Sequence, residues 1–154
     1  MKELKFNSQV CTTKIQSQRL LELGLKPETA DMVLFKSYDL PQYPFDYTFN
    51  QDPNALVNCS YVPMVKGNQP YIQAGNIPAW SLHRLIELLP QDIHLDDYAD
   101  THYYLTINPF KVIYVNSHRL WIYQRDEGCL YDKLVDTIEW TIKNNFFNKE
   151  YLKQ

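Results

Sequence analysis

Hydrophobic residues recur at helical spacing in three stretches of the chain, most clearly in IPAWSLHRLIELLP, residues 77–90. The residues at positions i, i+3, i+4 and i+7 of this stretch are Leu82, Leu85, Ile86 and Leu89. Ser81 is suited to cap the helix, because its hydroxyl can accept from a free N–H of the first turn. Trp80 precedes the cap and is expected to pack on the first turns, while Pro90 ends the pattern. The stretch therefore predicts a short buried helix.

The stretch SQRLLELGL, residues 17–25, predicts an earlier short helix. Ser17 is a candidate N-cap, since serine hydroxyls satisfy free backbone donors there. Gly24 can adopt the left-handed conformation that ends a helix, and Leu25 can then fold back onto the last turn. Pro27 suits the first position of a second short helical turn in the following PETADM. We therefore expect two short helices in the N-terminal half.

The longest helical pattern is LYDKLVDTIEWTIKNNFF, residues 130–147. One predicted face is hydrophobic and consists of Tyr131, Leu134, Val135, Ile138, Ile142 and Phe146. The opposite face is predicted to be polar and consists of Asp132, Lys133, Asp136, Glu139 and Lys143. Such a helix is expected to lie across a sheet with its hydrophobic face buried. The polar segment that follows it, NKEYLKQ, is expected to fray.

Short runs of β-branched and aromatic residues predict the strands: THYYLTI, KVIYVN and LWIYQ, in residues 101–124. The connections between these runs are too short for crossover helices, which favours an antiparallel meander. KVIYV has hydrophobic residues on both faces, as is typical of a central strand. Residues 33–35 are expected to begin another strand, and YVPMV, residues 61–65, suits an edge strand because it contains a proline. The prediction is one α+β domain over residues 1–154, with a mostly antiparallel sheet of three to five strands and a C-terminal helix packed on it.

Composition and charge exclude several classes of function. The chain has 154 residues, of which 45% are hydrophobic and 21% charged, as expected of a folded domain. Its net charge is −3 and its basic residues are scattered, which argues against general nucleic-acid binding. Neither a signal peptide nor a run of about 20 apolar residues is present in the sequence. Three dispersed cysteines without paired spacing favour reduced thiols, so we expect a cytoplasmic protein without a membrane partner.

Tyrosine and proline are concentrated in residues 38–75, and the chain as a whole holds 12 tyrosines. Long helices are excluded there because proline removes a backbone donor and fixes φ. Tyrosine rings with hydroxyl tips make good binding surfaces, but the same rings can also cover a sheet. The candidate binding residues of this segment are Tyr38, Tyr43, Tyr47, Tyr61 and Tyr71.

The stretch HLDDYADTH, residues 94–102, holds two imidazoles and three carboxylates and is the candidate metal site. The possible ligands for a divalent ion are His94, Asp96, Asp100 and His102. Neither helical nor extended geometry brings these side chains into a compact site without help from other segments. Because the stretch follows a proline-terminated helix, we expect an acidic loop exposed to solvent.

No other pattern indicates catalysis or a cofactor. The surroundings of Cys11 and Cys129 include no basic residue that would activate a thiol, and His83 is expected to be exposed on its helix. Phosphate-binding glycine motifs are absent, and the chain has four glycines in all. We therefore predict no catalytic residue and no cofactor.

Two motifs resemble a group of short proteins from gut bacteria of the Bacteroides type and their prophages. These are LLELGLKPETADM in residues 20–32 and PAWSLHRLIELLP in residues 78–90. Together with the final helix, the resemblance covers about half of the chain. It implies a mobile-element origin and a cytoplasmic protein, and no activity.

We therefore expect a non-enzymatic accessory protein that binds another protein, with no bound metal and with a contiguous aromatic patch on its surface. The alternative is a small hydrolase that depends on a divalent metal. That alternative requires the residues of the 94–102 stretch to converge in a cleft with a further acid such as Asp31 or Asp126.

Overall fold

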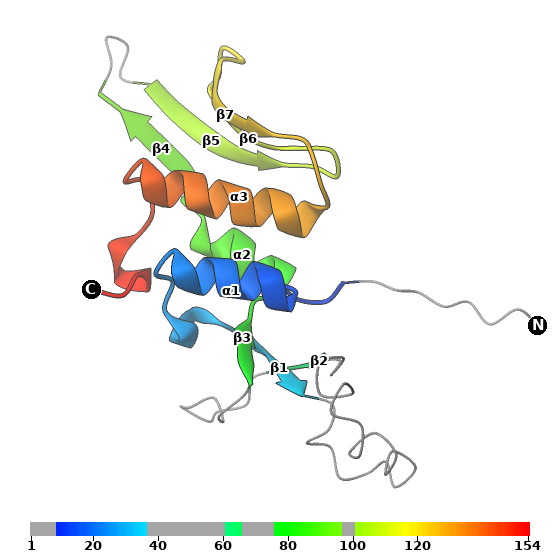
Figure 1. The fold of residues 1–154 in the computed structure, drawn as a ribbon. Coiled ribbons are helices and arrows are strands. Elements are labelled where there is room, and N and C mark those ends of the chain that lie inside the picture. Colours follow the sequence, from blue (N-terminus) through cyan, green and yellow to red (C-terminus); the bar gives the residue numbers. More distant parts are fainter. Residues whose placement is uncertain (1–8, 37–60, 66–75, 97–100) are drawn as a thin grey trace, which may run out of the picture.

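The computed structural model describes residues 9–36, 61–65, 76–96 and 101–154, with the backbone alone for residues 35–36 and 61–65. These residues form an α+β fold with three α-helices and two antiparallel sheets. A four-stranded sheet lies against helix α3 (Leu130–Lys143), and helices α1 (Lys14–Glu22) and α2 (Leu82–Leu88) lie on the other side of α3 (Figure 1). A three-stranded sheet lies beyond α1 and α2. The predicted fold class is therefore confirmed. The difference is that the strands form two sheets.

The four-stranded sheet contains the predicted meander. Its strands β4 (Asp92–Leu95), β5 (Thr101–Ile107), β6 (Val112–Val115) and β7 (Trp121–Arg125) follow one another in that order. β6 is central, and Val112, Ile113 and Tyr114 are all buried, as the sequence predicts. β4 was not predicted, because its four residues alternate between polar and hydrophobic over too short a length to be distinctive.

The three-stranded sheet has β1 (Met32–Lys36) in its centre, with β2 (Tyr61–Val65) and β3 (Ile77–Ala79) as its edges. Both pairings are antiparallel. The edge position of β2 agrees with its proline, Pro63, which has no N–H to donate to a second neighbour. β3 was missed, since three residues directly before a helix give no periodic signal.

Helix α1 (Lys14–Glu22) starts earlier than the sequence predicts. Its N-cap is Thr13, whose hydroxyl accepts from the Gln16 N–H while the Gln16 side chain accepts from the Thr13 N–H. Ser17 is not the cap but lies buried inside the helix, 2.7 Å from the Thr12 hydroxyl. The reciprocal pair satisfies two free donors, which favours Thr13 over Ser17. Gly24 ends the helix with φ +94°, as predicted.

Helices η1 (Pro27–Thr29) and α2 (Leu82–Leu88) agree with the sequence. Pro27 begins η1, and the Ser81 hydroxyl accepts from the Arg84 N–H at 3.2 Å to cap α2. Trp80 is fully buried next to that cap. His83 is exposed, as expected.

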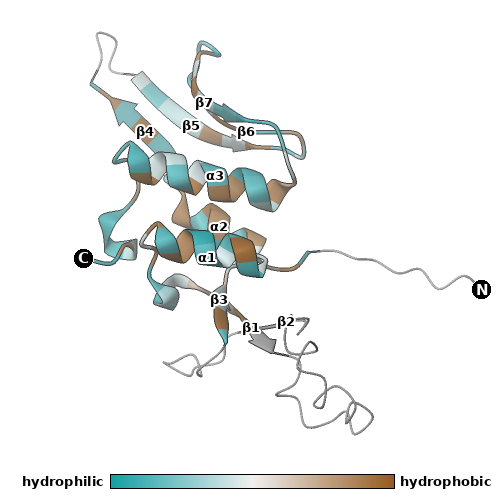
Figure 2. Cartoon of the chain, in the orientation of Figure 1, coloured by the Kyte–Doolittle hydropathy of each residue, from teal (hydrophilic) through white to brown (hydrophobic). Residues whose placement is uncertain are grey.

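Helix α3 (Leu130–Lys143) buries the predicted hydrophobic face. Figure 2 shows brown and teal residues alternating along it, as expected of an amphipathic helix. One predicted polar residue is misplaced: Lys133 is only 4% exposed. Its aliphatic stem lies in the interior while its ammonium donates to the Pro109 carbonyl at 3.2 Å.

The segment after α3 does not fray. Residues Lys149–Tyr151 form the helical turn η5, and Leu152 forms a β-bridge with Leu25. The Lys26 N–H donates to the Tyr151 carbonyl, and the Lys153 N–H donates to the Gly24 carbonyl. Fraying was the wrong prediction because these backbone hydrogen bonds, rather than side-chain polarity, hold the segment.

The main core lies between the three helices and β6. Its buried residues are Leu20, Leu25, Ala30, Trp80, Leu85, Leu88, Leu89, Val112, Tyr131, Leu134, Val135, Ile138 and Phe147. Residues from both ends of the sequence therefore share one cluster. Among the described helices, none is long and apolar enough to cross a bilayer.

Candidate interaction surface

The four-stranded sheet has two faces of different character. The face toward α3 carries a ring cluster in which Tyr114 and Tyr123 stack on Trp140, with ring centroids 5.8 Å and 4.6 Å apart. Burial raises the pKa of Tyr114 far above that of a free phenol, and the Tyr114 hydroxyl donates to the Pro90 carbonyl at 2.7 Å. This face is part of the protein interior.

The opposite face, which we call the outer face, is covered by none of the described helices. All described helices lie on the α3 side of the sheet (Figure 1). Successive strand residues point to opposite faces and cross-strand partners share one, which assigns the side chains of the outer face. By alternation and pairing they are Asp92, His94, His102, Tyr104, Thr106, Ile113, Val115 and Gln124. Trp121 joins them through its pairing with Val115, across a register irregularity between Tyr114 and Val115 that interrupts the alternation along β7.

Aromatic and aliphatic residues meet near the middle of the outer face. Val115 of β6 lies opposite Tyr104 on one side and opposite Trp121 on the other. Tyr104 and Trp121 are 52% and 59% exposed, which is high for such large rings. Ile113 in the same central strand is only 6% exposed. The two accessible rings of Tyr104 and Trp121 thus lie on either side of the aliphatic residues of β6.

Two histidines extend this row toward the end of β4. His94 and His102 are cross-strand partners, and their rings stack with centroids 4.6 Å apart. His102 Nδ1 lies 2.7 Å from an Asp92 carboxylate oxygen, and His94 Nδ1 lies 3.7 Å from an Asp96 oxygen. The His102 ring is also stacked beside Tyr104, at 6.2 Å. The four rings therefore belong to one surface.

The expected loop over residues 94–102 is only partly a loop. His94 ends in β4 and His102 in β5, because pairing between the two strands satisfies their backbone groups. Of the four candidate metal ligands, His94 and His102 are brought together, Asp96 lies beside His94, and Asp100 is outside the described residues. Within the described ranges, no three His, Cys, Asp or Glu side chains are grouped so as to hold a metal ion.

The two further acids of the metal hypothesis lie elsewhere in the fold. Asp31 precedes β1, where its carboxylate accepts from the backbone N–H and the hydroxyl of Ser81. Asp126 follows β7 at the end of the sheet away from His94 and His102, since Arg125 pairs with Val112. Neither acid therefore adds to the histidine pair.

Two of the three cysteines, Cys11 and Cys129, lie in the described part of the chain. Burial, with a smaller contribution from the Asp31 carboxylate, raises the pKa of Cys11 to about 11. A thiol that holds its proton this firmly is a weak nucleophile at neutral pH. Cys11 and Cys129 are both free thiols, and Cys129 is exposed.

The sequence located part of this surface. The predicted tyrosines Tyr38, Tyr43, Tyr47 and Tyr71 lie outside the described residues, as does the side chain of Tyr61. Tyr104 and Trp121 were not singled out. The alternation in THYYLTI separates Tyr103 from Tyr104 but does not say which of the two faces the core.

No protein-family model, curated protein or solved structure matches the chain in the comparisons made with each. The resemblance to proteins of Bacteroides-type bacteria stays a prediction.

Proposed function

We propose that this chain is a non-enzymatic interaction protein that binds a partner protein through the outer face of its four-stranded sheet. The observation that carries the proposal is the exposure of Tyr104 and Trp121 on either side of Val115. Exposed rings on a regular, rigid scaffold supply contact area at low entropic cost. An accessory role in the cytoplasm, with a mobile-element origin, fits the two free thiols and the sequence motifs.

The charge of the outer face favours a protein over a nucleic acid. None of its nine described strand positions is lysine or arginine. Binding to a phosphate backbone relies on such residues, and its affinity increases with their number. The only carboxylate among these strand positions, Asp92, is paired with His102. We therefore expect a partner surface that is apolar in its centre and nearly uncharged.

The arrangement of side chains also matches a protein interface. Interfaces typically have an aromatic and aliphatic centre that excludes charge, surrounded by polar residues that form hydrogen bonds. Here Tyr104, Val115 and Trp121 form the centre, while Thr106, Gln124 and the histidine pair surround it. A few central residues usually carry most of the binding free energy. Tyr104 and Trp121 are the expected pair.

Affinity purification from the native host, followed by reconstitution with the purified partner, tests the proposal. We expect Trp121→Ser to weaken the complex by about 2 kcal/mol or more, since large central rings contribute this much. Phe110→Ser is the matched control, because Phe110 is 79% exposed and lies in the turn between β5 and β6, outside the strand positions that make up the outer face. Binding is measured by titration calorimetry, and hydrogen exchange reports whether β5 and β7 become protected.

Two outcomes contradict the proposal. One is that Trp121→Ser and Tyr104→Ser bind the partner as tightly as the unsubstituted chain does. The other is self-association through the same face, detected by light scattering as a dimer that Trp121→Ser dissociates. The second outcome replaces the foreign partner with a second copy of the chain.

The histidine pair keeps a metal-dependent hydrolase as the second candidate. Two imidazoles 4.6 Å apart on one face are a possible partial donor set for Zn²⁺ or Mn²⁺. Metal analysis of the purified protein before and after chelation separates the two candidates. A stoichiometric metal that is lost in His94→Ala, or a melting temperature raised by Zn²⁺ or Mn²⁺, favours the hydrolase. An unchanged melting temperature favours the interaction protein.

A further inference from the structure

A pocket of about 350 Å³ lies on a part of the molecule that shares no residue with the outer face. Three segments that are distant in sequence line it: residues 26–29 around η1, residues 84–88 of α2, and residues 150–151 of η5. The backbone hydrogen bond from Lys26 to Tyr151 holds two of these walls together. The indole of Trp80, which lies just before α2, donates to the Thr29 hydroxyl at 3.0 Å and so connects the α2 segment to the η1 segment. The pocket is thus a built part of the fold.

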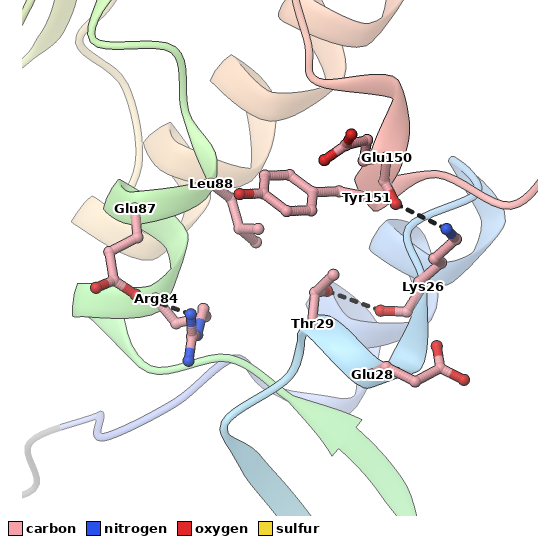
Figure 3. A pocket seen from close by; sticks show the side chains of 8 residues that line it. All are labelled: Lys26, Glu28, Thr29, Arg84, Glu87, Leu88, Glu150 and Tyr151. Carbon is pink, nitrogen blue, oxygen red and sulfur yellow. Dashed lines mark hydrogen bonds and ion pairs between the residues drawn. The ribbon is translucent and has the colours of Figure 1, made fainter.

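Both signs of charge line the pocket. Figure 3 shows Arg84 and Lys26 on different sides of the open space. Glu87 accepts from one terminal nitrogen of Arg84 at 2.9 Å, but Arg84 Nε is enclosed and has no hydrogen-bond partner among the described residues. A carboxylate that binds a guanidinium side-on accepts from Nε and a terminal nitrogen together. Binding of a carboxylate in this way requires the Arg84 side chain, which is 41% exposed, to rotate so that Nε faces the pocket.

The remaining charges of the lining are carboxylates. Glu28 and Glu150 form no side-chain ion pair with another described residue. Together with Glu87 they give the lining three carboxylates against two cations, Lys26 and Arg84, so its net charge is negative. Phosphates and dicarboxylates are disfavoured there by repulsion between like charges. A ligand that carries one carboxylate and one ammonium group matches both signs.

The size and the uncharged walls narrow the ligand further. Ligand pockets usually measure roughly 300–1,000 Å³, so this one suits a molecule near the small end of the range. The Tyr151 ring and Leu88 stand next to each other along one side of the space (Figure 3). They offer an apolar surface to a hydrocarbon group on the ligand.

We propose that this pocket binds a free α-amino acid with an apolar side chain. The carboxylate of the ligand pairs with Arg84, its ammonium group pairs with the glutamates of the lining, and its side chain packs on Leu88 and Tyr151. This site is independent of the proposed protein interface, so either proposal can fail without the other.

Titration of the isotope-labelled protein with leucine and with phenylalanine, followed by amide chemical shifts, tests the proposal. We expect saturable shifts in the three lining segments, and no shifts at Tyr104 or Trp121. Arg84→Gln should weaken binding about tenfold or more, as expected for the loss of hydrogen bonds to a charged group. Arg119→Gln is the matched control, since Arg119 lies in the exposed turn between β6 and β7.

Ligand analogues distinguish a zwitterion from a simple ion. 4-Methylpentanoate lacks the ammonium group of leucine, and isoamylamine lacks its carboxylate. Each analogue should therefore bind at least about tenfold more weakly than leucine. Equal binding of either analogue overturns the proposal. So does binding of inorganic phosphate in preference to leucine, or the absence of any saturable shift with both amino acids.

Discussion

Trp80 connects the segment before α1, the helical turn η1 and the main core. Its backbone N–H donates to the Thr12 hydroxyl, its carbonyl accepts from the Thr12 N–H, and its indole N–H donates to Thr29. The ring itself is fully buried in the main core. Trp80 therefore combines a large hydrophobic contribution with the hydrogen bonds that place η1 and the segment before α1.

Replacing Trp80 separates these contributions. We expect Trp80→Ala to lower the free energy of unfolding by about 3–5 kcal/mol, because the ring leaves a cavity. Trp80→Phe keeps much of the ring and loses the hydrogen bond to Thr29, so its cost should be clearly smaller. Urea denaturation measures both. Similar costs for the two variants would contradict the assignment of most of the energy to packing.

Because of Cys11, the free energy of unfolding should depend on pH in the alkaline range. Its pKa is about 11 in the folded chain against 9.0 for an unperturbed thiol, so the unfolded chain loses this proton first. The free energy of unfolding should therefore fall as the pH rises from about 9 to about 11, by linkage. Cys11→Ala should fall less over the same interval in urea denaturation at each pH. An equal decline in both proteins would contradict the buried thiol as the cause.

At the scale of single elements, the end of α1 depends on one backbone conformation. Gly24 has φ +94°, and the N–H groups of Gly24 and Leu25 donate to the carbonyls of Leu21 and Leu20. This is the hydrogen-bond pattern of a Schellman motif. A Cβ at position 24 would meet no atom within 4 Å, so the constraint is conformational and not steric.

Gly24→Ala should therefore destabilise the chain by about 1 kcal/mol, which is the penalty of the left-handed region for a residue with a Cβ. Gly24→Asn should cost less, because asparagine tolerates this region better. Thermal and urea unfolding of the two variants measure the difference. An alanine variant as stable as the unsubstituted chain would show that the motif is not needed.

Elements with several turns or an unbroken pattern are the ones that the sequence predicted well. α3, α2 and β5 have enough residues for their periodicity to stand out. The cap of α1 was misplaced because Thr13 and Ser17 are both good cap residues, and the sequence does not show which of them is buried. β3 and β4 were missed because their length is too short to establish a period.

The candidate site was predicted only in part, for a related reason. The sequence singled out His94 and His102, which the structure brings together. It did not single out Tyr104 and Trp121, because choosing the open face of a sheet requires knowing on which side α3 packs. Pocket-lining residues such as Lys26, Arg84 and Tyr151 come from three distant segments and share no local pattern.

At the scale of the whole molecule, a network of charges ties three layers together. Asp136 of α3 accepts from Arg19 of α1 and from Arg125 of β7, both at 2.6 Å. Arg19 also pairs with Glu139, which is paired in turn with Lys143. These hydrogen bonds lower the pKa of Glu139 below its usual value. The network joins the helical layer to the edge strand of the sheet.

We expect Asp136→Asn to destabilise the fold by about 1 kcal/mol, since partly exposed ion pairs are worth little individually. The loss should shrink in high salt, because salt screens such pairs. The control is Glu127→Gln, which removes an exposed partner of Arg125 and should change stability little. Urea denaturation at low and high salt measures both. A salt-independent loss would indicate a packing defect instead.

The pairing of residues 151–153 with residues 24–26 has a consequence for biosynthesis. Leu20 and Leu25 are buried in one cluster with residues of α3 and with Phe147 and Leu152, which the ribosome adds much later. The nonpolar side chains of α1 therefore leave the ribosome before their partners in α3 have been synthesised. The core can therefore close only after α3 and the segment up to Leu152 have been synthesised, and a nascent chain arrested before residue 130 should remain sensitive to proteases.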